Sequence, residues 1–221
     1  MKKPTLLLLL VGLLASCTTD SYESGDGKLS QMRADFVVAY TDGRSQLVSA
    51  MTDDGDSLVF NEPTSVKWAS VADSVYRLLL YHEPAEKEQT HPMSFVQMLT
   101  INIQRSPADS AKRMMDPLTF ESLWMSKNRR FLNMGIALKT GQHDPKVLQK
   151  LGVWCDTVIT RDDKSRLFRL FVYHDQGGVP EYYSAKYYAS IPLAPHNLRK
   201  GDEIELTVNT YQGVQRRVIA Y

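Results

Sequence analysis

Residues 203–209, EIELTVN, alternate strictly between polar and aliphatic side chains. Successive side chains of a β-strand point to opposite faces of its sheet, so this pattern predicts a strand with one solvated and one buried face. Tyr211-Gln212-Gly213-Val214 follows as a turn and leads into VQRRVIAY at 214–221. We therefore predict that the chain ends in an antiparallel pair of strands.

The second half of the chain contains further strand-like runs. They are TFESLWMS (119–126), RRFLNMGIALK (129–139), LFRLFVY (167–173) and AKYYASIPL (185–193). The stretch DPKVLQKLGVWC (144–155) stays open, because Asp144-Pro145 could begin a helix while its apolar residues also fit a strand. Short strands separated by turns at this spacing are typical of a β-sandwich. We predict such a domain over residues 105–221.

The first half is also rich in strand signals. The runs are ADFVVAY (34–40), SQLVSAM (45–51), SLVFN (57–61), SVYRLLLY (74–81) and SFVQMLTINI (94–103). Asp42-Gly43 lies between the first two runs and predicts a hairpin with a type I′ turn, in which both central residues have positive φ. Five short strands are about what a small barrel needs. We predict a barrel domain over residues 29–104.

Residues 105–117 interrupt the strand pattern. Ser106 is a good N-cap, Pro107 suits the first position of a helix, and Asp109 lies three residues after the cap. Asp116-Pro117 would end such a helix. The alternative is a loop. The fold class predicted from the sequence is therefore all-β, with a short connecting helix between a small barrel and a sandwich.

The N-terminal residues are typical of an export signal. Lys2 and Lys3 precede a nine-residue apolar run at 6–14, which is too short to span a bilayer and is typical of a secretory signal. Leu14-Ala15-Ser16-Cys17 is similar to a bacterial lipobox, in which Cys17 is lipidated and becomes the new N-terminus. The alternative is a plain secretory signal with a chance cysteine. We predict a lipoprotein signal peptide over 1–16 and membrane attachment through Cys17, because acyl chains bind a bilayer firmly.

The segment after Cys17 is polar and acidic, and residues 17–28 are predicted to be a flexible tether. In the lipoprotein sorting that this segment resembles, an aspartate directly after the lipidated cysteine favours retention at the inner membrane. Here that position is Thr18, so the expected location is the outer membrane, on its periplasmic face or at the cell surface. The acidic residues Asp20, Glu23 and Asp26 are weakly similar to the surface-export signals of Bacteroidetes lipoproteins.

Composition excludes several classes of function. Removal of the predicted signal peptide takes away Lys2 and Lys3 and leaves 24 of the 26 basic residues against 25 acidic ones. The net charge of the mature chain is then close to zero, so nothing suggests a nucleic-acid partner. The chain has 2 cysteines, and with Cys17 committed to lipid no disulfide framework is available. The neighbours of Cys155 suggest a buried apolar thiol, since none of them would lower its pKa.

The chain resembles a known family in several places. The lipobox, the SLWMS and RRFLNMGIALK runs, the YYSAKYYASIPL segment (182–193) and the GDEIELTVNTYQG segment (201–213) are similar to the NigD-like lipoproteins of Bacteroidetes. This resemblance implies an N-terminal OB-like barrel followed by a C-terminal β-sandwich. The family name derives from a proposed association with bacteriocin immunity. The family offers no catalytic or binding motif to carry over.

We find no catalytic motif in the residues. The 5 histidines are scattered, and no HExxH, CxxC or GxSxG pattern occurs. Two of the carboxylates of Glu121, Asp156 and Glu181 could act as a glycosidase pair only if the fold brought them together. The run Asp53-Asp54-Gly55-Asp56 lacks the spacing of a calcium loop and is interpreted as a turn. We expect no catalytic residue, no metal and no cofactor, and therefore no enzyme.

The best hint of a binding surface is a group of tyrosines. It consists of Tyr182, Tyr183, Tyr187 and Tyr188. Alternate members would share a face of a strand and could contact a protein or a glycan of the envelope; half-buried strand aromatics are the alternative. The leading hypothesis is a lipid-anchored, non-catalytic binding or accessory module of the cell envelope. The second is a protein–protein interaction of the bacteriocin-immunity type, and the third an unrecognised envelope hydrolase.

Overall fold

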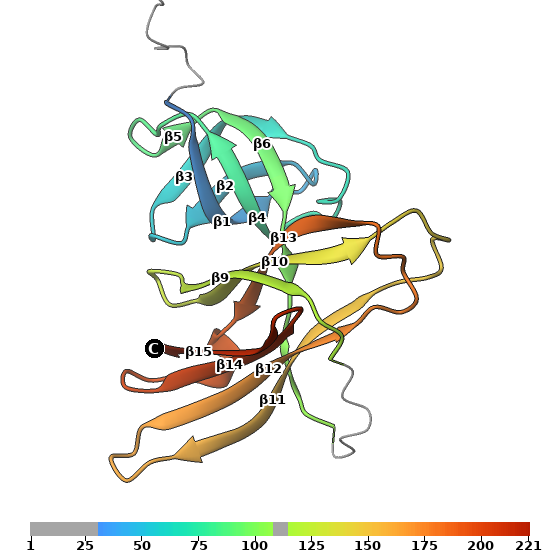
Figure 1. The fold of residues 1–221 in the computed structure, drawn as a ribbon. Coiled ribbons are helices and arrows are strands. Elements are labelled where there is room, and N and C mark those ends of the chain that lie inside the picture. The colour runs from blue at the N-terminus through green and yellow to red at the C-terminus, as the bar shows by residue number, and fades with distance from the viewer. Residues whose placement is uncertain (1–30, 108–114) are drawn as a thin grey trace, which may run out of the picture.

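The structure, a computed structural model, describes residues 31–107 and 115–221 (Figure 1). The predicted signal peptide (1–16), the lipidation site Cys17 and the tether (17–28) lie outside the described residues. So does most of the helix predicted over 105–117, because 108–114 are not described. Within the two described ranges, no helix is long and apolar enough to cross a membrane.

The all-β fold predicted from the sequence is confirmed, with three sheets. The first sheet, which we call the half-barrel, curls over one end of the molecule (Figure 1). Its strands in spatial order are β5 (Gln89–Thr90), β3 (Ser57–Thr64), β2 (Leu47–Thr52), β1 (Arg33–Thr41), β4 (Val75–His82) and β6 (Pro92–Gln97). Aliphatic side chains from β1, β2 and β4 fill its core, with Val37, Leu47, Leu78 and Leu80 fully buried.

The hairpin predicted between β1 and β2 is confirmed, but its predicted turn type is wrong. The positive φ falls on Ser45 at 59°, and Gly43 is not among the residues with positive φ. The Asp42 carboxylate accepts hydrogen bonds from the backbone N–H groups of Arg44 and Gln46, both at 2.9 Å. This carboxylate therefore holds a longer loop than the two-residue turn that Asp-Gly normally forms.

The other two sheets pack face to face and form the sandwich. One has the order β7 (Leu99–Thr100), β13 (Tyr183–Pro192), β10 (Phe131–Thr140) and β9 (Thr119–Met125). The other has the order β15 (Gly213–Ala220), β14 (Glu203–Thr210), β12 (Arg166–Asp175), β11 (Lys150–Thr160) and β8 (Ile103–Arg105). A 3₁₀ turn, η3 (Ala194–His196), follows β13.

The strand predicted from the alternation at 203–209 is confirmed as β14. Ile204, Leu206 and Val208 are buried in the sandwich core, while the residues between them are half-buried on the outer face. β14 and β15 pair antiparallel from Glu203↔Ala220 to Thr210↔Gly213. The stretch 144–155, left open between helix and strand, begins as turns and becomes strand β11 at Lys150.

Strand β10 is the central element of the molecule, because both of its faces are buried. Its even-numbered residues Leu132, Met134 and Ile136 lie in the sandwich core. Its odd-numbered residues face the other way, and among them Phe131 and Asn133 contact the half-barrel. At β10 the chain is therefore three layers thick.

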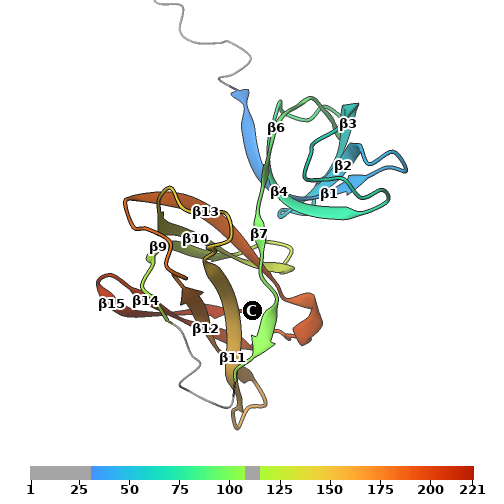
Figure 2. The ribbon, with the colours of Figure 1, turned by 90° about the vertical axis from the view of Figure 1, so that its right-hand side faces the viewer.

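The segment 92–105 joins the layers, and here one strand prediction is wrong. Residues 94–103 were expected to form one strand, but β6, β7 and β8 belong to three different sheets and lie at an edge of each. Figure 2 shows this green segment running from the half-barrel down to β11. Met98 and Ile101 are buried between these strands, and the Ile101 N–H donates to the carbonyl of Ser190 at 2.9 Å. Pairing with the sandwich therefore begins at Leu99, within the range 29–104 predicted for the barrel.

A buried arginine ties the half-barrel to the sandwich. The side chain of Arg77, on β4, is 4% exposed and makes a two-pronged ion pair with Asp53, at 2.8 and 2.6 Å. Its Nε donates to the Ser190 hydroxyl at 2.9 Å, and its Nη2 also donates to the side-chain oxygen of Asn133 at 3.1 Å. The Phe131 ring lies 4.1 Å from the guanidinium carbon. We call Arg77, Asp53, Asn133 and Ser190 the junction network.

Two hairpins reinforce this junction. The β2–β3 turn (53–56), which the sequence favoured as a turn over a calcium loop, directs Asp54 to Lys127 at 2.6 Å. Asn128, in the β9–β10 turn, donates its backbone N–H to the carbonyl of Asp53 and its side-chain amide to that of Thr52. Asp53 and Asp54 of this turn therefore pair with the basic side chains of Arg77 and Lys127.

We predict that Arg77→Ala lowers the free energy of unfolding by about 3–5 kcal/mol, because the Asp53 carboxylate, only 13% exposed, would lose its charged partner. Chemical denaturation of the purified protein measures this. Arg44→Ala is the control, since Arg44 is 79% exposed and its pair with Asp42 should contribute less than about 1 kcal/mol. Equal stability of the two variants would contradict the prediction.

Candidate functional site

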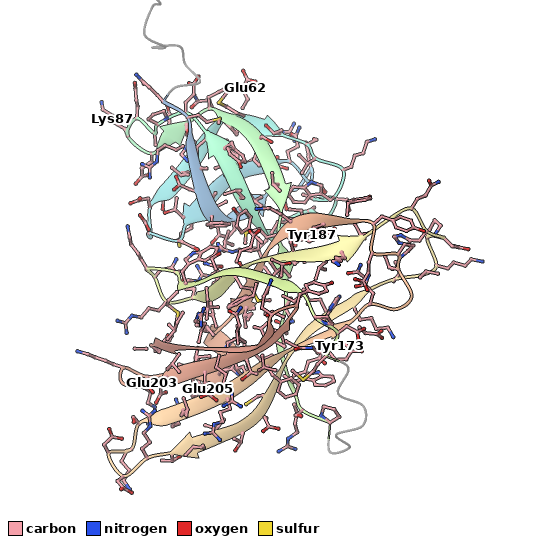
Figure 3. The ribbon with its side chains drawn as sticks, viewed as in Figure 1. Glu62, Lys87, Tyr173, Tyr187, Glu203 and Glu205 are labelled. Carbon is pink, nitrogen blue, oxygen red and sulfur yellow. The ribbon has the colours of Figure 1, made fainter. Side chains whose placement is uncertain are left out.

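Two open clefts meet at one edge of the molecule and share Leu99, Thr100 and Tyr187. The first, which we call the sandwich cleft, has a volume of about 420 Å³ and opens into the end of the sandwich. The second, the junction cleft, has a volume of about 770 Å³ and lies between the half-barrel and β13. In Figure 3, Tyr187 lies at the level where the half-barrel meets the sandwich.

The walls of the sandwich cleft are mainly aliphatic. Ile101, Leu138 and Leu151 belong to the sandwich core or pack against it, so the cleft reaches the core itself. Leu148 stands at the cleft and is 63% exposed. An aliphatic side chain of this size in water is available for contact with another molecule.

The polar residues of the sandwich cleft are held by backbone carbonyls. The Gln149 side-chain amide donates to the carbonyl of Lys139 at 2.6 Å, and the His143 Nδ1 lies 2.5 Å from the carbonyl of Gly141. These bonds fix the orientation of both side chains. The cleft thus combines an apolar wall with a small number of oriented polar groups, which is typical of a binding site.

The junction cleft is built by four strands, β4 and β6 of the half-barrel and β7 and β13 of the sandwich. Leu79 and Tyr81 come from β4, and Val96 comes from β6, where it is 45% exposed. β13 contributes Lys186, which is paired with Glu121 at 2.8 Å. Met98 lines this cleft and lies next to the Ser190 hydroxyl of the junction network. The network therefore supports one wall of the cleft.

The four tyrosines singled out in the sequence do not form one common platform. Tyr187 borders both clefts and is 39% exposed. Tyr188 points to the opposite face of β13, where its ring lies 5.2 Å from Phe36 and 6.2 Å from Trp124. It therefore also packs between the half-barrel and the sandwich.

The other two tyrosines lie at the start of β13. Tyr182 precedes the strand and is 81% exposed, and its ring covers Gly141, whose added Cβ would come within 2.7 Å of it. Tyr183 is 60% exposed and pairs with Thr140. Neither of them lines the two clefts. Tyr188 lines the junction cleft, and Tyr187 lines both clefts.

Leu99, Val96 and Leu148 were not predicted from the sequence as residues of a site. A signal for the first two was present in SFVQMLTINI, where Val96 and Met98 occupy even positions and the aliphatic residues from Leu99 onward occupy odd ones, while Phe95 departs from this pattern. Such a change of phase reverses the face on which apolar side chains lie. It marks the point at which the chain leaves one sheet for another.

One histidine lies in an arrangement similar to a catalytic triad. The His82 Nε2 is 2.9 Å from Asp35, and its Nδ1 is 2.9 Å from the Thr90 hydroxyl. However, that hydroxyl donates to the carbonyl of Glu83 at 2.6 Å, and Thr90 is 2% exposed. A nucleophile must reach its substrate, and the buried Thr90 hydroxyl cannot do so. We therefore interpret these hydrogen bonds as structural contacts that join β1 to the loop after β4. The hydrogen bond from His82 is the main cause that lowers the pKa of Asp35.

The remaining candidates for chemistry stay apart. Glu121 lies on β9, Asp156 on β11 and Glu181 in the loop before β13, where it pairs with Lys139 at 3.5 Å. Across residues 31–107 and 115–221, no three His, Cys, Asp or Glu side chains gather as a metal site would require. Cys155 is half-buried, and burial, with a smaller effect of Asp156, raises the pKa of its thiol.

Comparison with known proteins gives likenesses of fold. No family model matches the chain. No curated protein matches it either. Among solved structures, a NigD-like immunity protein from Bacteroides caccae has a TM-score of 0.64 and 18% identity, over 84% of this chain and 91% of that one.

Two further structures share this architecture. A protein of unknown function from Bacteroides vulgatus has a TM-score of 0.62 and 14% identity, over 86% of this chain and 91% of that one. A candidate lipoprotein from Bacteroides fragilis has a TM-score of 0.55 and 10% identity, over 86% of this chain and 96% of that one. At these identities the likeness concerns the fold, and the resemblance to NigD-like proteins seen in the sequence is confirmed at that level.

Proposed function

We propose that this protein is a lipid-anchored accessory protein of the cell envelope that binds a segment of a partner protein across the two clefts, without catalysis. The observation that carries the proposal is the exposed apolar surface where the clefts meet, formed by Val96, Leu99, Leu148 and Tyr187. Contiguous apolar side chains at the surface mark interaction sites. Aromatic residues such as Tyr187 are enriched among the residues that dominate binding energy.

The chemistry of the walls favours a protein segment over a glycan. A saccharide needs many hydrogen-bonding groups, whereas the sandwich cleft is lined mainly by aliphatic side chains, and its residues Gln149 and His143 already bind backbone carbonyls. Two neighbouring hollows separated by Leu99 and Tyr187 suit an extended segment that carries two apolar side chains. The second candidate function is a protein–protein interaction of the bacteriocin-immunity type, which the name of the immunity protein from Bacteroides caccae favours.

The location rests on the lipobox at Leu14–Cys17 and on the likeness to a candidate lipoprotein. We infer attachment to the outer membrane through an acylated Cys17. Residues 18–30 would then separate the folded part from the membrane. Thirteen residues reach at most about 3.3–3.6 Å each when extended, roughly 45 Å in all, so the clefts would be accessible above the bilayer.

We predict that Cys17→Ser abolishes incorporation of labelled palmitate and moves the protein from the membrane fraction to the soluble fraction. The physical reason is that two or more acyl chains are needed for stable attachment, and the cysteine carries them. Ser16→Ala is the control and should still be labelled. Palmitate incorporation by Cys17→Ser would disprove the assignment.

We predict that Tyr187→Ala and Leu99→Ser each weaken binding of peptides at least tenfold, which is about 1.4 kcal/mol. The peptides are selected from a random displayed library against the purified protein, and calorimetry measures their affinities. Tyr182→Ala is the matched control, because Tyr182 is more exposed than Tyr187 and lies outside both clefts. Selection of no peptide, or equal binding to Tyr187→Ala and Tyr182→Ala, would contradict the proposed function.

A further inference from the structure

A separate hollow of about 310 Å³ lies on the outer face of the five-stranded sheet of the sandwich. The register of the strands places one row of side chains across this face, in the order Trp154, Phe171, Thr207 and Arg216. Figure 3 shows Glu205, from the next row, well away from Tyr187. This face is therefore distinct from the two clefts.

The hollow forms where β12 and β14 separate. The two strands pair in parallel as far as Phe171↔Thr207. Beyond this pair, residues 115–118 run between them: the N–H of Asp116 donates to the carbonyl of His174, and the N–H of Leu118 to that of Asn209. The backbone at the fork is therefore hydrogen-bonded on both sides, which gives the hollow a fixed shape.

The floor and one side of the hollow are apolar and aromatic. Phe171 and Met115 line it. Beside them lies the half-buried Trp154 ring. Its centroid is 5.4 Å from that of Phe171, which it meets edge-on, and 4.5 Å from that of Tyr173, at an interplanar angle of 30°. Aromatic rings held by their neighbours in this way are rigid contact surfaces.

The other side of the hollow carries charged groups of both signs. Arg169 and Glu205 lie opposite each other on β12 and β14 and form an ion pair at 3.4 Å. Asp156 is the extra residue of a β-bulge, a feature that re-aims side chains, and it lines the hollow. The guanidinium of Arg216 forms no hydrogen bond or ion pair within residues 31–107 and 115–221. Among the described residues, two acidic and two basic side chains line the hollow, so their formal charges balance.

We propose that this hollow is a binding site for a neutral saccharide. A sugar hydroxyl both donates and accepts hydrogen bonds, so it suits neighbouring guanidinium and carboxylate groups, and its C–H face suits an aromatic floor. The balanced charge disfavours strongly anionic or cationic ligands. The volume lies at the lower end of the range for small-molecule sites, which corresponds to one or two sugar rings. This inference is independent of the protein partner proposed for the clefts.

The test is calorimetric titration of the purified full-length protein, solubilised with its anchor, with defined trisaccharides. The neutral probes are maltotriose, cellotriose, xylotriose, mannotriose and tri-N-acetylglucosamine, and trigalacturonic acid is the charged probe. We expect saturable binding of at least one neutral probe. Arg216→Ala and Glu205→Gln should weaken this binding at least tenfold.

Arg217→Ala is the matched control. Arg217 is the next residue on β15, but it lies opposite Leu206, on the other face of the sheet, so binding should be unchanged. Thermal unfolding of each variant separates loss of contact from loss of structure. Failure of all neutral probes to bind, binding of trigalacturonic acid alone, or affinities in Arg216→Ala and Glu205→Gln equal to the wild type would overturn the proposal.

Discussion

The buried guanidinium of Arg77 is the constraint that sets the rest of the structure. A buried charge is tolerated only when its donors are satisfied, and here the acceptors come from two layers: Asp53 from the half-barrel, and Asn133 and Ser190 from the sandwich. Asn133 also donates to Asp53 and accepts from Ser190, so the four side chains form a closed network. Apolar contacts alone would allow the layers to slide, whereas directional bonds permit one arrangement.

That arrangement determines the shape of the clefts. Met98 donates its backbone N–H to the carbonyl of Arg77, and its sulfur lies 4.0 Å from the Ser190 hydroxyl, so the chain leaves the half-barrel directly over the network. Leu99 then joins β13 and Ile101 enters the sandwich core. Because both walls of the junction cleft are fixed before a ligand arrives, little conformational entropy is lost on binding.

Alternation of polar and apolar residues located most strands, because burial of one face imposes a period of two wherever a strand stays in one sheet. It failed at 94–103, where the chain changes sheets, and it could not identify Arg77 as a junction residue. The partners of Arg77 lie 24, 56 and 113 residues away in sequence. Asp42-Gly43 predicted the wrong turn because the Asp42 side chain captures two backbone N–H groups, a contact that dipeptide preferences do not include.

The candidate sites were less visible in the sequence than the fold, since each is assembled from strands that only the tertiary structure brings together. Tyr187 and Tyr188 are neighbours in sequence, yet Tyr187 borders both clefts, whereas Tyr188 borders the junction cleft and packs against Phe36. Arg169 and Glu205 form a pair only because β12 and β14 run parallel in one register. The aliphatic clefts and the charged hollow also differ in chemistry and belong to different faces, so occupation of one does not block the other. If both proposals hold, the protein could engage a partner protein at the clefts and a saccharide at the hollow at the same time.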